Sequence, residues 1–305
     1  MRRLERLSGH LVVALVVLVV IGGATRVMEA GLACPDWPLC YGTLLPGRQM
    51  NLQVFLEWFH RLDAFVVGIA LLVLAAVSVF ARRRLPPWLP PLCLAALLLV
   101  AVQGGLGALT VIQLLPAALV TAHLATALLL VALVSGMHQG LRVTAAALPG
   151  AQQAAPQARG LAVAAMVVGL MVFTQCLLGG AMASQWAADR CVGLGEACRW
   201  LLFHRRMAQV SALAVLLLAG TVLLRSRGWG IRWLGITAGA LVLAQVGLGV
   251  STLRLGLAVP ALTIGHQLVA VLLVAVIAAV VGHGLAMTAP GPMSADASFA
   301  EVIHG

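Results

Sequence analysis

Eight long apolar segments restrict the fold of this chain more than any other feature of its sequence. Each is close to the roughly 20 residues that an α-helix needs to cross a bilayer. They lie at about residues 9–26, 58–80, 92–111, 117–138, 160–183, 203–224, 233–253 and 261–286. Because backbone polar groups in lipid must be hydrogen-bonded within their own helix, we predict an all-α integral membrane bundle of eight transmembrane helices.

The composition excludes a soluble globular domain. Of the 305 residues, 62% are hydrophobic and 9% are charged, and the mean hydropathy is +1.06. Soluble domains carry about 25% charged residues. The first apolar segment is long and no small-residue cleavage pattern follows it, so we interpret it as a span and not as a signal peptide.

The arginines predict the orientation in the membrane. All 19 basic residues are arginine, and the formal net charge is +10. They lie in short connections, where positive residues mark the cytoplasmic side, so we expect no nucleic-acid partner. One side holds Arg2, Arg3, Arg6, Arg82, Arg83, Arg84, Arg142, Arg159, Arg225, Arg227 and Arg232. We predict a multi-pass protein of the plasma (inner) membrane with both termini in the cytoplasm.

A repeated pattern divides the chain into two halves. Glycine-rich strings end the first, third, fifth and seventh segments, and the span after each string begins with a histidine. The strings lie at 21–26, 103–111, 175–182 and 245–253, and the histidines are His60, His123, His204 and His266. We predict two pseudo-symmetric four-helix halves, 1–143 and 160–287, with a linker at 144–159 and a disordered tail at 288–305.

The four histidines indicate metal binding. A metal-binding side chain within a membrane span is costly and usually functional. Two imidazoles from facing helices can occupy both axial positions of a haem iron. We therefore pair His60 with His123 and His204 with His266 in two bis-histidine haem sites. A hydrogen-bonded core histidine and plain helix packing would explain a single copy of the pattern, but four copies in phase favour haem.

The two halves differ at Glu57. This carboxylate lies three residues before His60, where the C-terminal half has Leu201 before His204. Residues at i and i+3 share a helix face, so Glu57 could serve as a proton carrier or general base. Its alternative role is to cap the helix or to pair with Arg61. Arg61 and Arg205, each directly after a histidine, could contact haem propionates or form ordinary salt bridges.

Four cysteines lie in the outside loops. Pairs at short spacing on the oxidising side of a membrane favour disulfides, here Cys34 with Cys40 and Cys191 with Cys198. A zinc site is the alternative, but these spacings do not fit the usual one. The first loop could cap the N-terminal site, or its cysteines could form a redox-active pair.

Several strings together resemble the haem A synthase family over residues 9–286. They are GGATR at 22–26, CPDWPLCYG at 34–42, EWFHR at 57–61, QGGLGALTV at 103–111 and FTQCLLGGAMA at 173–183, together with the histidines at 123, 204 and 266. The resemblance implies an enzyme that oxidises a ring methyl group of haem O to formyl, through a hydroxymethyl intermediate, to give haem A for cytochrome oxidase.

The resemblance also implies roles for individual residues. Glu57 would be the catalytic carboxylate. His60 and His123 would bracket the substrate haem O, and His204 and His266 would ligate haem b. Both cysteine pairs match the family. Besides membrane lipid, haem O synthase is the implied docking partner, and electrons must come from or go to an external partner that the sequence does not identify.

Another class of protein remains open at this point. A membrane cytochrome b that transfers electrons from quinol through two bis-histidine haems would also need the four histidines. It would not explain a carboxylate beside only one of the pairs. For the enzyme, two filled axial positions leave two routes: either one histidine leaves the iron, or electrons leave the porphyrin and oxygen comes from water.

Overall fold

The computed structural model describes residues 1–146, 155–184, 198–226 and 228–288. Within this part, eight helices are long and apolar enough to cross a membrane, which confirms the predicted fold class. They are α1 (Arg2–Val27), α2 (Leu52–Phe80), α3 (Leu89–Ile112), α4 (Ala117–Ala146), α5 (Ala155–Ser184), α7 (Arg199–Arg225), α8 (Trp229–Arg254) and α9 (Pro260–Thr288).

Most helices extend beyond the apolar segments that predicted them. The start of α2 is an example, because the helix begins at Leu52, before the predicted segment at 58–80. Asn51 caps it by accepting a hydrogen bond from the Val54 N–H at 3.0 Å, as expected of an N-cap asparagine. An apolar window locates the part of a helix within lipid, whereas hydrogen bonding continues until a cap ends it.

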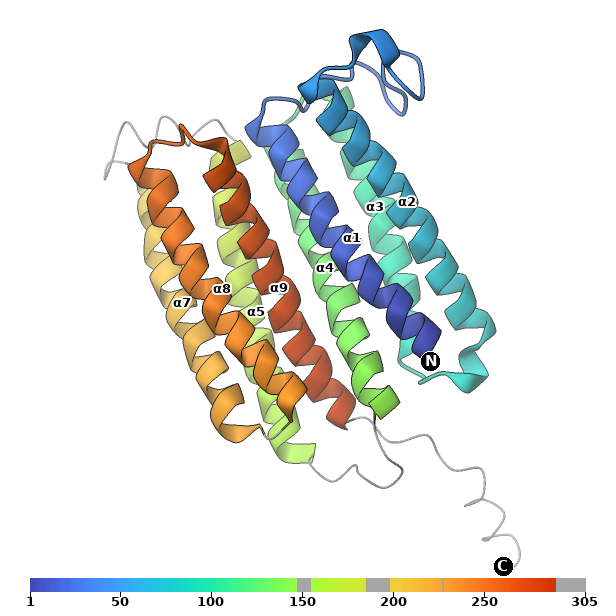
Figure 1. Ribbon diagram of the computed structural model, residues 1–305, viewed down its shortest axis with the longest axis vertical. Coiled ribbons are helices and arrows are strands. Elements are labelled where there is room, and N and C mark those ends of the chain that lie inside the picture. Colours follow the sequence, from blue (N-terminus) through green and yellow to red (C-terminus); the bar gives the residue numbers. More distant parts are fainter. Residues whose placement is uncertain (147–154, 185–197, 227, 289–305) are drawn as a thin grey trace, which may run out of the picture.

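The helices run side by side along the long axis of the molecule (Figure 1). α1 to α4 form one group and α5 to α9 the other, and the two groups meet mainly where α4 packs against α9. Buried apolar residues of these two helices, such as Val131, Val134 and Ile277, form the centre of the core. The halves therefore share one core.

Small residues bring α4 and α9 very close together. The Ser135 hydroxyl donates a hydrogen bond to the Ala275 carbonyl at 2.7 Å. A Cβ added at Gly282 would lie 2.7 Å from the carbonyl carbon of Gly136 and 2.8 Å from its Cα. In membranes, where helices gain no hydrophobic free energy by leaving lipid, such close packing drives association.

The start of α1 and the end of α9 lie at the same end of the bundle (Figure 1). The short helix η2 (Arg82–Arg84) connects α2 to α3 at that end too. The arginines at the start of α1 and those of η2 therefore lie at the same end of the bundle. The segment 28–51, which contains the short helix η1 (Gly47–Gln49), lies at the opposite end.

The predicted linker includes helical residues at both of its ends. α4 continues to Ala146 and α5 begins at Ala155, so the helices extend into the range 144–159. Alanine has the highest helix propensity, and the segment is alanine-rich. The predicted tail lies outside the described residues except for Thr288, which ends α9.

Candidate haem-binding sites

α2 and α4 place His60 opposite His123. Their ring centroids are 6.4 Å apart, and the ring planes are inclined by 73°. Two metal–imidazole bonds of about 2 Å each, together with the half-widths of two rings, fit this separation. Nδ1 of each ring is buried, and no described residue forms a hydrogen bond with it. The pair therefore fits a metal held between two imidazoles.

α7 and α9 bring together the second pair. His204 and His266 lie close enough to interact electrostatically. As in the first pair, Nδ1 of His266 is buried and has no hydrogen-bond partner within the described part of the chain. The structure therefore brings the four histidines together in the pairs that the repeat predicts.

A glycine of the preceding long helix lies against each of the four imidazoles. Added Cβ atoms at Gly22, Gly107, Gly179 and Gly249 would lie 2.8, 3.2, 3.0 and 3.0 Å from Cε1 of His60, His123, His204 and His266, respectively. Cβ contacts this short require the ring to move. The repeated glycines are thus explained by the space that the imidazoles occupy, in addition to helix packing.

The neighbouring glycines connect the two halves. Gly23, beside Gly22, lies against the side chain of Gln267, which follows His266 on α9. Gly180, beside Gly179, lies against Leu124, which follows His123 on α4. Each glycine pair therefore touches a histidine of its own half and the neighbour of a histidine in the other half. Sequence reasoning missed these contacts because they depend on how the halves dock.

Three of the four imidazoles also contact a glutamine amide. The amide nitrogens of Gln103 and Gln245 lie 3.2 and 3.3 Å from Nε2 of His123 and His266, and that of Gln175 lies 3.0 Å from Nδ1 of His204. Each glutamine precedes the histidine-contacting glycine of its helix by four residues. The glutamines were visible in the repeat, but their contact with the histidines was not predicted.

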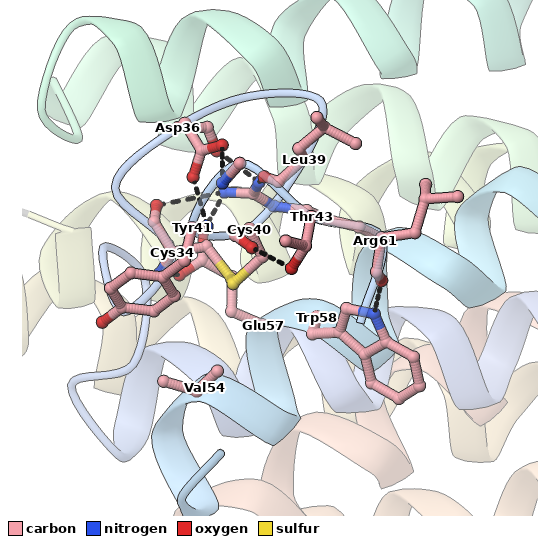
Figure 2. Close-up of a disulfide and its surroundings, with 12 residues drawn as sticks. Cys34, Asp36, Leu39, Cys40, Tyr41, Thr43, Val54, Glu57, Trp58 and Arg61 are labelled. Carbon is pink, nitrogen blue, oxygen red and sulfur yellow. Dashed lines mark hydrogen bonds and ion pairs between the residues drawn. A yellow bond between two sulfur atoms is a disulfide. The ribbon is translucent and has the colours of Figure 1, made fainter. Parts of the chain in front are cut away.

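Glu57 joins the His60 end of α2 to the first outside loop (Figure 2). The carboxylate is 4% exposed. Its Oε2 accepts a hydrogen bond from the Cys34 N–H at 2.8 Å, and its Oε1 pairs with Nη2 of Arg61 at 2.5 Å. The predicted pairing with Arg61 is thus present. Because Asn51 caps α2, the capping alternative for Glu57 is wrong.

Arg61 binds the same loop from beside the carboxylate (Figure 2). Its Nη1 donates to the carbonyl oxygens of Asp36 and Leu39, both at 2.6 Å. A propionate would compete with these bonds for the guanidinium, so the structure favours a loop-binding role over the predicted propionate contact. Arg205, at the corresponding position on α7, is exposed.

A disulfide closes the loop that Glu57 and Arg61 hold. Cys34 and Cys40 are bonded with an S–S distance of 1.97 Å, which confirms the prediction and leaves neither thiolate for a zinc ion. The Asp36 carboxylate accepts hydrogen bonds from the N–H groups of Tyr41 and Gly42 at 2.6 and 2.8 Å. In the third outside loop, Cys198 is disulfide-bonded, and Cys191 lies outside the described residues.

Residues 5–278 match the family described as cytochrome oxidase assembly protein. Similar relatives include the heme A synthase of Sphingopyxis alaskensis, which is 31% identical over 88% of both chains. The heme A synthase of Shewanella oneidensis is 31% identical over 58% of this chain and 56% of its own length. That of a Chelativorans species is 33% identical over 50% of this chain and 43% of its own. The matched part thus spans about half of two of these relatives and most of the third.

Proposed function

This chain belongs to the cytochrome oxidase assembly protein family, and we propose that it is a haem A synthase. It would be an oxidoreductase that converts haem O to haem A by oxidising one ring methyl group to formyl. The similarity to a heme A synthase over 88% of both chains supports this activity. The observation that carries the proposal is the arrangement of two histidine pairs with a buried carboxylate beside one of them.

We assign the substrate haem O to His60 and His123, and haem b to His204 and His266. The unpartnered ring nitrogens and the glycines against each imidazole support this ligation. Haem b would supply a one-electron carrier in the C-terminal half. The division into a substrate half, residues 1–143, and a haem b half, residues 160–287, follows from this assignment.

Glu57 is the proposed proton acceptor of the substrate half. Its carboxylate is buried on the helix that carries His60, one turn before that ligand. Arg61 pairs with it at 2.5 Å, so the proposed acceptor lies beside a guanidinium and under the disulfide loop. Arg205, which follows His204 on α7 and is exposed, is the proposed propionate contact.

We also propose the membrane, the orientation and the partners of this protein. Eight spanning helices make the chain a multi-pass membrane protein. The clustering of arginine-rich connections at one end of the bundle supports a plasma (inner) membrane orientation with both termini cytoplasmic. Haem O synthase is the proposed docking partner, and an external electron-transfer partner is required.

The first test is pigment analysis in a host that makes haem O but no haem A. We would extract the haems and separate them by chromatography with mass detection, for the parent and for Glu57→Ala and His60→Met. We expect haem A or its hydroxymethyl precursor in the parent and at least a ten-fold loss in both variants. A folded parent carrying only unmodified haem, with an electron partner supplied, would instead favour the electron-carrying cytochrome b.

A glycine variant tests the ligand assignment without measuring activity. Gly249→Ala should lower the haem content, because its Cβ would lie 3.0 Å from Cε1 of His266 and displace the ring from its position. Gly247→Ala is the matched control two residues away, since a Cβ there has no atom of the described residues within 4 Å. Haem per protein, measured on purified samples, should fall by about half for Gly249→Ala if only the C-terminal site empties. Equal contents in the two variants would contradict the assignment.

A further inference from the structure

We propose that Asp63 selects haem O over haem b in the substrate half, by accepting a hydrogen bond from the hydroxyl group of the haem O side chain. This assignment rests on the proposed function and adds a residue that recognises its substrate. Haem O differs from haem b in one substituent, since a hydroxyalkyl group with a long isoprenoid chain replaces a vinyl group. A site for haem O therefore needs a hydrogen-bonding group that a site for haem b does not need.

The four helices that carry the histidines agree at one following position and differ at another. Four residues after the histidine, each of them has alanine: Ala64, Ala127, Ala208 and Ala270. Three residues after it, the substrate half has polar residues, Asp63 and Thr126. The haem b half has Met207 and Val269 at these places. Residues at i and i+3 share a helix face, so the substrate half is polar one turn deeper than its ligands, where these positions of the haem b half are apolar.

Asp63 has a hydrogen-bond acceptor that the described residues leave unused. Its Oδ2 is buried, and none of them forms a hydrogen bond with it. The Thr126 hydroxyl, in contrast, already donates to the side-chain oxygen of Gln103. An ionisable side chain within a membrane span is costly without a partner and is usually functional. The carboxylate of Asp63 therefore fits a bound group that donates a hydrogen bond, as a hydroxyl does.

Asp63 lies on the inner face of α2. His60 precedes it on this face, and Val67, which is buried, follows it one turn later. Leu62 and Phe65 belong to the opposite, exposed face of the helix. Because α2 runs from the outside loop toward the end of the bundle that holds η2 (Figure 1), Asp63 lies about 4.5 Å deeper than His60 along the helix axis.

This depth fits the edge of haem O that carries the hydroxyalkyl group. The propionates are charged, and charge is costly within a membrane, so they favour the outer end of the spans. The hydroxyalkyl group belongs to the opposite edge of the macrocycle, which then points toward the middle of the membrane. Glu57, three residues before His60, and Asp63, three residues after it, therefore lie at the levels of the two opposite edges.

The haem b half is arranged differently at the same depth. Met207, at the corresponding place on α7, has a thioether, which is a weak acceptor. The Ser211 hydroxyl is buried and has no hydrogen-bond partner in the described part of the chain, but it follows His204 by two turns and lies about 10 Å deeper. A haem O molecule in this half would bury its hydroxyl beside Met207, at a cost that haem b avoids.

Competition between the two haems tests this without measuring turnover. The purified protein is equilibrated in detergent with a series of mixtures of oxidised haem O and haem b, with no electron donor present. The bound haems are then extracted and separated by chromatography. The haem O of the substrate site is the part that is lost in His60→Leu. For Asp63→Met, which introduces the residue of the haem b half, the ratio of haem O to haem b that half-fills this site with haem O should rise by roughly 10-fold or more.

A reciprocal variant keeps the test decisive if Asp63→Met cannot be purified. Met207→Asn places an acceptor at the same depth in the haem b half, so it should raise the amount of haem O that His60→Leu still binds. Met207→Leu is the matched control and should leave that amount unchanged. An unchanged ratio for Asp63→Met, an equal loss of both haems, or no gain in Met207→Asn would overturn the selection by Asp63 and leave the synthase proposal intact. Equal amounts of haem O in the parent and in His60→Leu would overturn the assignment of haem O to His60 as well.

Discussion

Gly282→Ala is expected to prevent the two halves from packing into one stable bundle. A Cβ at this position would overlap the Gly136 carbonyl group of α4, and it would lie 2.7 Å from the carbonyl carbon and 2.8 Å from Cα. These are backbone atoms in the middle of a helix, so they cannot rotate away as the end of a side chain can. Overpacking a core costs about 1–3 kcal/mol when side chains can adjust, and here the cost should exceed that range.

The measurement is the yield of monodisperse protein in detergent and its melting temperature. We expect Gly282→Ala to aggregate or to melt at least about 6 °C below the parent, since about 1 kcal/mol shifts the melting temperature of a 150–250-residue protein by roughly 2–4 °C. Gly220→Ala is the control, because among the residues that the structure describes no atom lies within 4 Å of a Cβ there. It should melt at or slightly above the parent temperature, as alanine is favoured over glycine in a helix interior. Indistinguishable melting of the two variants would show that α4 and α9 can separate without loss of the fold.

The number and type of the helices could be predicted because a long apolar segment in lipid must satisfy its backbone hydrogen bonds internally, which an α-helix does. The pairing of the histidines could be predicted too, since His60, His123, His204 and His266 occupy equivalent places in a repeated unit. The contact between Gly23 and Gln267 could not, because a repeat describes each half and carries no information on how the halves dock.

The surroundings of Glu57 also include a contact that could be predicted from the sequence and a contact that could not. Its pairing with Arg61 was a foreseeable alternative, because residues at i and i+4 are neighbours on a helix. Its bond to the Cys34 N–H depends on the path of a loop with 23 residues of sequence separation between donor and acceptor. The bonds from Arg61 to the carbonyls of Asp36 and Leu39 could not be predicted for the same reason, because these carbonyls reach the guanidinium only in the folded loop. These bonds occupy the guanidinium that was predicted to contact a propionate.

Glu57→Ala is expected to release the disulfide loop from α2 and to abolish turnover. The substitution leaves the Cys34 N–H without its acceptor and leaves Arg61, whose side chain is 15% exposed, without its carboxylate. Removing one partner of a buried ion pair costs about 3–5 kcal/mol. If this free energy is lost from the closed conformation of the loop, the loop should open more often. The Cys34–Cys40 disulfide should then be accessible to reductant at least about 100 times more often. The rate of its reduction, followed by maleimide labelling and peptide mass mapping of Cys34 and Cys40, measures this directly.

Glu57→Gln separates the two roles that the carboxylate combines. A glutamine oxygen can still accept the hydrogen bond from Cys34 and one from Arg61, but the side chain has no negative charge and cannot take up a proton in the physiological range. We therefore expect the disulfide in this variant to be reduced within a few-fold of the parent rate, while haem A formation falls by roughly 100-fold or more, as for the loss of a general base. A glutamine variant that formed haem A at the parent rate would exclude Glu57 as the proton acceptor. The carboxylate would then act only by holding the loop over the His60 end of α2, and the proton would have to leave the substrate site through another group, of which Asp63 is the nearest carboxylate along the same helix.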